Sequence, residues 1–266
     1  MVRPAPGYVE LQVQTNFSFL RGGSHAHELV ERAGALGHQA IAVCDRNTLA
    51  GVVRAHAAAE EAGLQLIVGA RLDLEDGPSL LSFPKDRAAY GRLSRLLSLG
   101  QGRSPKGGCI LFLDDVAALA EGQVFVVLAP EDWCWREALV ARGACEAPCQ
   151  AEERTVLDFR GRDGEARETH TVAVGGACGA GGEQGIGRQK RKTQSFEAEL
   201  KRVCGALGSE HLYLAVSYLY RGDDRARLEA LAQIADRARI EIVATNDVLY
   251  HAPQRRPLQD VLTCIR

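Results

Sequence analysis

The chain has 266 residues, of which 46% are hydrophobic and 25% are charged, and its formal net charge at pH 7 is -2. These values describe an ordinary globular protein of one large or two small domains, and they exclude an overall electrostatic attraction to nucleic acid. No apolar run approaches the roughly 18 residues that span a bilayer. The first ten residues, "MVRPAPGYVE", lack the apolar core of a signal peptide. We therefore expect a cytoplasmic protein that does not contact a membrane.

The eight cysteines do not form a recognisable metal motif. Five of them stand singly among apolar residues, where a small buried hydrophobe is the expected role: Cys44, Cys109, Cys134, Cys204 and Cys264. Cys145 and Cys149 are spaced as C-x3-C and are followed by His170 and Cys178. A zinc site would need a second closely spaced pair, which is missing, so we do not predict one.

Residues 1–142 alternate between strand patterns and helix patterns. The expected strands cover residues 8–14, 39–44, 64–74, 79–83 and 123–128. The expected helices cover residues 24–36, 49–62, 86–99, 114–120 and 131–142, with Ser24 as the N-cap of the first. This alternation predicts an α/β protein with a largely parallel sheet, either open or closed into a barrel.

The alternation stops at about Gly143 and resumes after Ser195. The intervening segment has nine glycines between Gly161 and Gly187, lacks a sustained apolar period and ends in the basic run "RQKRK" at 188–192. We expect residues 143–195 to be a disordered or poorly ordered insertion, with the basic run solvated rather than bound to nucleic acid.

Ordered patterns return in the last part of the chain. Helices are expected at 196–207, 223–238 and 257–265, and strands at 211–218 and 240–244. No stop signal follows the last helix before Arg266, so we expect a fragment of a longer protein. Tyr213, Tyr218 and Tyr220 follow strand spacing, and we expect them in the core and at its rim rather than on a base-stacking platform.

Four strand ends carry unusual residues, and strand ends that converge on one face can build a site in an α/β barrel. These are Gln12 with Gln14, Asp45 with Arg46, Gly69 with Arg71, and Asn246 with Asp247. The two glutamines are notable because amides are poor metal ligands and cannot act as general bases.

Five stretches, in this order, resemble the PHP (polymerase and histidinol phosphatase) domain at the N-terminus of bacterial DNA polymerase III alpha-type replicases, and more narrowly the error-prone paralogue. They are "ELQVQTNFSFLRGGSH", "DRNTLAGVVRAH", "DRAAYGRLSRLLSLG", "SYLYRGDDRARLEAL" and "TNDVLYHAPQRRPLQDVLTCIR". The resemblance covers residues 1–142 and 196–266, which we interpret as the two parts of a PHP domain around the 143–195 insertion. It implies a distorted (β/α)7 barrel, related to the TIM barrel, with six or seven strands.

The resemblance also implies where metal ligands would lie. The positions of the family's ligands, in chain order, are occupied by Gln12, Gln14, Arg21, Arg46, Arg71, Ser79, Asp247 and Leu249. Among these only Asp247 clearly keeps a ligand type. Three arginines would place permanent positive charge where the cations bind in the family, so we expect a degenerate site that binds no metal.

An alternative use of these charges is a structural one. We expect Asp45 and Asp247 to pair with Arg21, Arg46 and Arg71, so that an ion-pair cluster replaces the metal cluster.

Two histidines have more than one interpretation. His25 is expected to pack or to hydrogen-bond at a helix start. His251 either approaches Asp247 across one helical turn or lies in solvent.

The resemblance implies a scaffold domain of a DNA-directed DNA polymerase, a nucleotidyltransferase of damage-tolerant replication and repair. Polymerase chemistry uses metal ions held by carboxylates in a palm domain, which we do not find in this chain. We therefore expect no catalytic residue and no cofactor here, Mg²⁺ in the polymerase domain of the full-length parent, and DNA contact through its missing domains. Other replication or damage-tolerance proteins are further candidate partners.

Two alternative functions stay open. The first is an active PHP metal-dependent phosphoesterase or 3′–5′ proofreading nuclease, and the number of metal ligands distinguishes it from the scaffold. The second is a non-functional truncated fragment.

Overall fold

The computed structural model describes residues 8–130, 133, 154–155, 171–172 and 195–266. The chain divides into two compact units, Met1–Pro130 with Gln194–Arg266, and Glu131–Thr193. In the second unit, β5 (Arg154–Thr155) pairs antiparallel with β6 (Thr171–Val172). The helix predicted at 131–142, the C-x3-C pair and nearly all of the predicted insertion lie outside the described residues.

A six-stranded sheet forms the centre of the first unit. Its order is β1 (Ala40–Arg46), β2 (Gln65–Leu72), β3 (Leu80–Pro84), β4 (Gln123–Val127), β7 (Leu212–Val216) and β8 (Glu241–Ala244). All neighbours pair in parallel except β3, which is antiparallel to both β2 and β4. The predicted parallel sheet is therefore corrected at β3. Only residues 73–79 separate β2 from β3, and this connection is too short for the crossover that a parallel pair needs.

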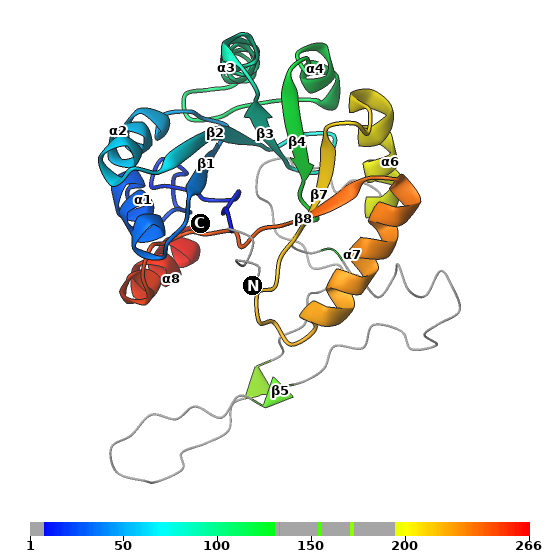
Figure 1. Cartoon of the computed structure of the whole chain (residues 1–266). Coiled ribbons are helices and arrows are strands. Elements are labelled where there is room, and N and C mark those ends of the chain that lie inside the picture. Colours follow the sequence, from blue (N-terminus) through cyan, green and yellow to red (C-terminus); the bar gives the residue numbers. More distant parts are fainter. Residues whose placement is uncertain (1–7, 131–132, 134–153, 156–170, 173–194) are drawn as a thin grey trace, which may run out of the picture. The chain divides into compact units, whose positions relative to one another are not determined.

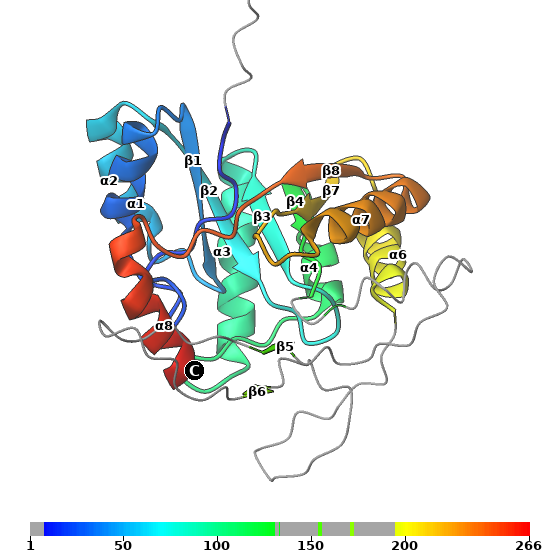
Figure 2. The same cartoon turned by 90° about the horizontal axis from the view of Figure 1, so that it is seen from below.

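The sheet curls into a half-barrel, and helices cover its outer side (Figures 1 and 2). The helices are α1 (Ala26–Ala35), α2 (Val52–Ala62), α3 (Arg87–Gly102), α4 (Leu113–Ala118), α6 (Phe196–Leu207), α7 (Asp224–Ala238) and α8 (Arg256–Ile265), with a 3-10 turn, η1 (Pro253–Arg255), before α8. None of the helices in these described ranges has the length and apolar character that a membrane span requires. The fold class inferred from the sequence, an α/β barrel type, is confirmed.

Alternation along β1 divides its side chains between two cores. Ile41 and Val43 pack in the outer layer with residues of α1 and α2, whereas Ala42 and Cys44 belong to the inner core. Because successive strand residues point to opposite faces, Asp45 lies on the outer side and Arg46 on the inner side. This division decides the charge pairing described below.

The N-terminal segment closes the curled sheet. It makes isolated bridges from Glu10 to Ile41 of β1 and from Val13 to Val248 after β8. The backbone N–H groups of Ala42 and Cys44 donate to the carbonyls of Glu10 and Val13. Three residue steps of this segment, from Glu10 to Val13, therefore lie opposite two steps of β1, from Ala42 to Cys44, as at a β-bulge. The regular strand predicted at 8–14 is wrong.

Most element boundaries lie within a few residues of those predicted, and the exceptions have local causes. The N-cap of α1 is His25 rather than Ser24. The Ser24 hydroxyl is instead 2.8 Å from His251 Nδ1, which ties the start of α1 to the segment before α8. Cys44 is buried as expected, whereas Cys264 is exposed near the end of α8.

Gly69 provides a test of the inner core. A Cβ atom at this position would lie 2.7 Å from Cys44 Sγ and 2.8 Å from the Phe83 ring. We expect Gly69→Ala to lower the free energy of unfolding by about 1–3 kcal/mol in a urea titration. As a control, Gly91→Ala in α3 meets no atom within 4 Å, and it should raise stability by about 0.5–1 kcal/mol. Equal stability of parent and Gly69→Ala would contradict this packing.

Candidate functional site

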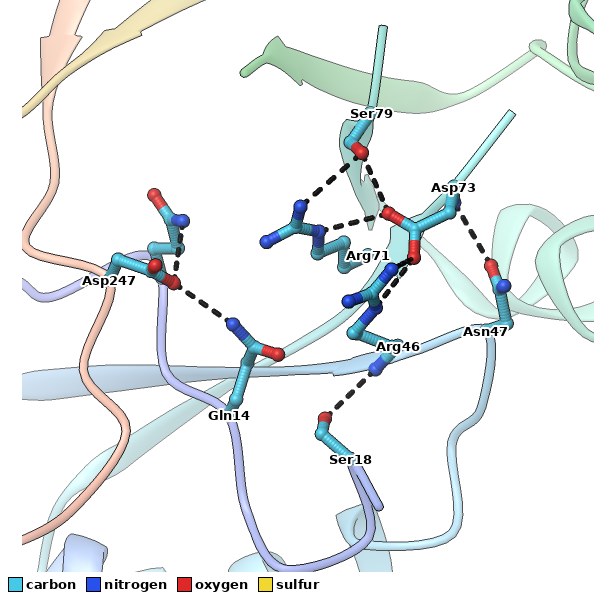
Figure 3. Close-up of polar contacts among 9 residues, drawn as sticks. Gln14, Ser18, Arg46, Asn47, Arg71, Asp73, Ser79 and Asp247 are labelled. Atoms are coloured by element: carbon cyan, nitrogen blue, oxygen red, sulfur yellow. Dashed lines mark hydrogen bonds and ion pairs between the residues drawn. The ribbon is translucent and has the colours of Figure 1, made fainter. Parts of the chain in front are cut away.

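Two glutamines and one aspartate join the first and last strand segments of the first unit. The side-chain Nε2 atoms of Gln12 and Gln14 both donate to Asp247 Oδ1, over 2.8 and 2.9 Å. Figure 3 shows the bond from Gln14. The Thr245 hydroxyl donates to Gln12 Oε1 over 2.8 Å and so fixes the orientation of that amide. Asp247 adopts a left-handed backbone with φ of 49°. We call these four residues the amide–carboxylate group.

One atom of this group has no partner. Gln14 is 1% exposed, and its Oε1 atom makes no hydrogen bond with any described residue. In Figure 3 this oxygen is turned away from Asp247. A buried acceptor without a donor is costly, so this oxygen is a weak point of the group.

Two arginines share one carboxylate on the inner side of the sheet. Arg46 and Arg71 are register neighbours on the parallel strands β1 and β2. Arg46 Nε donates to Asp73 Oδ2 over 2.6 Å, and Arg71 Nε donates to Asp73 Oδ1 over 3.1 Å (Figure 3). We call Arg46, Arg71 and Asp73 the arginine–carboxylate cluster.

Polar neighbours hold Asp73 in place. The Ser79 hydroxyl donates to Asp73 Oδ1 over 2.7 Å, and the Asp73 backbone N–H donates to Asn47 Oδ1 over 3.0 Å. Arg71 Nη2 also donates to Ser79 Oγ over 3.4 Å. Ser79, which we had expected at a ligand position from the resemblance, therefore supports the ion pairs.

The arginines determine the ionisation of Asp73. Burial acts to raise the pKa of Asp73, but the charges of Arg71 and Arg46 outweigh it and hold that pKa below its usual range. Burial and the charge of Arg71 lower the pKa of Arg46, against the opposing effect of Asp73. An arginine remains charged despite such a shift, so the cluster carries two positive charges and one negative charge.

Asp45 lies apart from this cluster, and its hydrogen-bond donors are neutral groups. It is 1% exposed and accepts three hydrogen bonds, from the Thr15 backbone N–H, the Thr15 hydroxyl and the Ser18 hydroxyl, over 2.7, 2.8 and 2.7 Å. Burial raises the pKa of Asp45, and the hydrogen bonds from Ser18 and Thr15 offset only part of that effect.

The structure corrects the predicted ion-pair cluster. Arg46 and Arg71 pair with Asp73, whereas we had expected Asp45 and Asp247 as their carboxylates. Asp45 is on the other face of β1, and Asp247 accepts hydrogen bonds from the Gln12 and Gln14 amides. The remaining predicted positions are in loops. The Arg21 backbone N–H donates to the Ser18 carbonyl, and the Leu249 carbonyl accepts from the Gly23 N–H.

The two histidines lie at the junction of α1 and α8. The His25 backbone N–H donates to Glu28, as expected for a residue at a helix start. His251 contacts Ser24 through Nδ1 and lies 3.8 Å from Glu28, so neither a contact with Asp247 nor a solvated position describes it.

Sequence reasoning missed Asp73 and Glu10. Arg71 and Asp73 are two residues apart at the end of a strand, so period-2 alternation places their side chains on one face. The sequence "ARLD" therefore already indicated that these two residues could pair. Glu10 is 4% exposed and accepts from the backbone N–H groups of Gln12 and Asn246 and from the Tyr8 hydroxyl. Its role depends on the bulged path of the N-terminal segment, which the sequence did not reveal.

The chemistry of this arrangement is that of ion pairs and hydrogen bonds. Within the described ranges, no group of three or more His, Cys, Asp and Glu side chains is placed to hold a metal ion. Asp45, Asp73 and Asp247 each bind a different set of donors rather than facing a common point.

Comparisons with known proteins agree with this fold. Residues 10–125 match the family model of the PHP domain. The chain is 41% identical to an error-prone DNA polymerase of Rhodopseudomonas palustris (strain HaA2), over 98% of this chain and 22% of that protein. It is also 41% identical to an error-prone DNA polymerase of Caulobacter vibrioides, over 100% of this chain and 19% of that protein.

The solved structures show the same class of fold. A candidate metal-dependent phosphoesterase from Bifidobacterium adolescentis aligns with a TM-score of 0.52 at 16% identity, over 94% of this chain and 90% of that chain. Residues 10–125 thus match a PHP domain, and the chain is similar over nearly its whole length to the N-terminal part of bacterial error-prone DNA polymerases. It spans about a fifth of the length of these relatives.

Removal of the Asp73 carboxylate tests the arginine–carboxylate cluster. Asp73→Ala would leave two largely buried guanidiniums side by side, and we expect a loss of about 3–5 kcal/mol in the free energy of unfolding. The control is Glu229→Ala, which removes an exposed helical partner of Arg225 and should cost under about 0.5 kcal/mol. If both variants lose the same small amount in urea titrations, the cluster does not stabilise the fold.

The opposite pKa shifts of Asp73 and Asp45 predict opposite effects of pH. The Asp73 pKa is lowered on folding, so its contribution is present above its unfolded pKa of about 3.9 and is lost as pH falls through the folded value. The stability difference between parent and Asp73→Asn should therefore shrink on acidification. The Asp45 pKa is raised, so the parent should instead lose stability relative to Asp45→Asn as pH rises from about 4. Urea titrations at a series of pH values measure both slopes, and slopes of the same sign would contradict the assignment.

Proposed function

We propose that this chain is the N-terminal scaffold part of a DNA-directed DNA polymerase that acts in error-prone, damage-tolerant DNA synthesis, and that its PHP site binds no metal. The similarity to error-prone DNA polymerases over nearly the whole chain supports the first half of the proposal. The arginine–carboxylate cluster supports the second half.

The position of Arg46 and Arg71 is the observation that carries the proposal. Both occupy positions where the family resemblance puts metal ligands, and both point to the inner side of the sheet. A divalent cation at this place would meet two fixed positive charges, and the single carboxylate between them is already engaged by both. Lost ligation and charge repulsion therefore act in the same direction.

The proposal assigns polymerase chemistry to other parts of the full-length protein. The Mg²⁺ ions of nucleotide addition, the main contacts with DNA, and docking of replication or damage-tolerance partners would belong to regions that this chain does not match in its relatives. We also propose that residues 1–142 and 196–266 together form the scaffold domain and that 143–195 is an insertion in it. In this account the chain acts in the cytoplasm and has no catalytic residue of its own.

The competing function is a metal-dependent phosphoesterase or proofreading nuclease. A phosphoesterase of this fold needs metal ions that activate water, and these need several convergent ligands. The likeness to the Bifidobacterium protein concerns the fold, whereas the polar groups described here are occupied by one another.

Metal analysis of the purified chain separates the two functions. After incubation with zinc, manganese or iron and removal of free metal, we expect substoichiometric amounts of each metal by elemental analysis. The comparison variant is Gln12→His/Gln14→His/Arg46→His/Arg71→Glu, which restores the ligand types and removes the arginines, and which should gain bound metal. Two or three ions per parent chain that are lost in Asp247→Ala would overturn the proposal.

A further inference from the structure

The loop between β7 and α7 exposes two neighbouring tyrosines. Tyr218 is 50% exposed and Tyr220 is 88% exposed, and their ring centroids lie 5.1 Å apart at an interplanar angle of 81°. We had expected both to lie in the core or at its rim because of their strand spacing. However, β7 ends at Val216, so that spacing does not set where they point. Only Tyr213, which is partly buried in β7, fits the expectation.

The backbone of this loop is held in a defined shape. The buried side chain of Asp224 accepts hydrogen bonds from the backbone N–H groups of Leu219, Arg221 and Gly222, over 2.7, 2.6 and 3.2 Å. Three bonds to one carboxylate fix the turn that leads into α7. The loop is therefore a preformed feature of the fold.

Tyr220 sits in this turn with a strained backbone. Its φ is 57°, in the left-handed region that disfavours residues with a side chain. The exposed ring contributes little burial that would offset this strain. A strained position that presents an aromatic side chain to solvent indicates a role in recognition rather than in folding.

Positive charge lies beside the tyrosine pair. Arg221 is exposed, and its side chain makes no hydrogen bond or ion pair with the residues that the structure describes. Arg225 is 90% exposed on the first turns of α7 and pairs with the exposed Glu229 over 3.3 Å. Asp223, also exposed, is the acidic neighbour. Aromatic faces with an adjacent arginine are the elements that bind unpaired bases and their phosphates.

The loop also has a defined place in the first unit. It follows β7, whose parallel neighbours β4 and β8 end at the same edge of the sheet (Figure 1). The chain after β8, which carries Asp247, leaves from this edge as well. Among the described residues, the tyrosine pair makes no hydrogen bond, ion pair or ring contact with the arginine–carboxylate cluster.

We propose that Tyr218 and Tyr220 form a stacking platform for unpaired bases of single-stranded DNA and that Arg221 contacts the adjoining phosphate. This inference rests on the proposed function, since a polymerase of damage-tolerant synthesis handles unpaired template. It adds to that function a DNA contact made by the scaffold part itself. An exposed aromatic pair would also suit a protein partner, but the exposed Arg221 and the two exposed rings favour stacked bases.

Fluorescence anisotropy of a labelled oligothymidylate, titrated with the full chain in the presence of EDTA, tests the platform. We expect saturable binding that weakens by about 5- to 150-fold in Tyr220→Ala or Tyr218→Ala, the range that corresponds to the loss of one stacked base. Tyr220→Phe keeps the ring and should bind like the parent. Tyr90→Ala, which removes a 39% exposed tyrosine from α3, is the matched control and should leave binding unchanged.

The salt dependence gives an independent measure of the phosphate contact. Arg221→Ala should reduce the slope of log affinity against log salt by about 0.7, the value for one phosphate contact on a single strand. Thermal melts of all variants should match the parent, because the substituted side chains are exposed.

Three results would overturn the platform. These are a parent chain that does not bind the oligonucleotide, alanine variants of Tyr218 and Tyr220 that bind like the parent, or a duplex of the same length that binds equally well. Binding that depends on the basic run at 188–192 but not on the tyrosines falls under the second result. Because EDTA removes divalent metal, these outcomes do not depend on whether the PHP site binds metal, so the two proposals can fail separately.

Discussion

The inner side of the curled sheet depends on one carboxylate that offsets the charges of two adjacent arginines. The register of β1 and β2 places Arg46 directly beside Arg71 on the inner side of a curled sheet. Two guanidiniums in a poorly solvated place repel each other, and burial of unpaired charge is costly. The Asp73 carboxylate accepts hydrogen bonds from both arginines and from the Ser79 hydroxyl, and Asn47 Oδ1 accepts from the Asp73 backbone N–H. The cluster therefore ties the end of β1 to the end of β2 and to the connection that leads into β3.

The amide–carboxylate group provides a second link, between the first and last strand segments of the first unit. Gln12, Gln14 and Asp247 come from opposite ends of the chain and meet through two hydrogen bonds to one oxygen. A glutamine amide keeps an N–H donor at a position where the family resemblance implies an imidazole, but it gives up the basic nitrogen that binds metal. In the proposed scaffold, the exchange keeps a link between the first and last strand segments without using the metal ligands that the resemblance implies. This explains why an edge that resembles an active site carries two glutamines.

Local sequence patterns predicted most of the helices and strands, because the bounds of these helices and strands depend on neighbouring residues alone. The bounds of α6 (Phe196–Leu207) agree with the prediction, since Ser195 caps its first turn and no tertiary contact displaces it. The bulge between Glu10 and Val13 was not predictable, because its extra residue is defined only against β1. The strand predicted at residues 8–14 therefore lacked this bulge.

The candidate site was likewise predicted only in part. The sequence identified the arginines and Asp247, but it assigned the wrong carboxylates to the arginines. Adjacent positions on a strand face opposite ways, so Asp45 could not reach the guanidinium of Arg46, whereas Asp73 shares a face with Arg71. The exposed tyrosine pair was missed because strand spacing was extended beyond the end of β7.

One carboxylate couples the two arginines to the fold. A double-mutant cycle of Arg46→Met and Asp73→Asn measures this coupling directly. Urea titrations of the parent, the two single variants and the double variant give the interaction energy, and the account predicts about 1–3 kcal/mol in favour of the pair. Strictly additive effects of the two substitutions would contradict it.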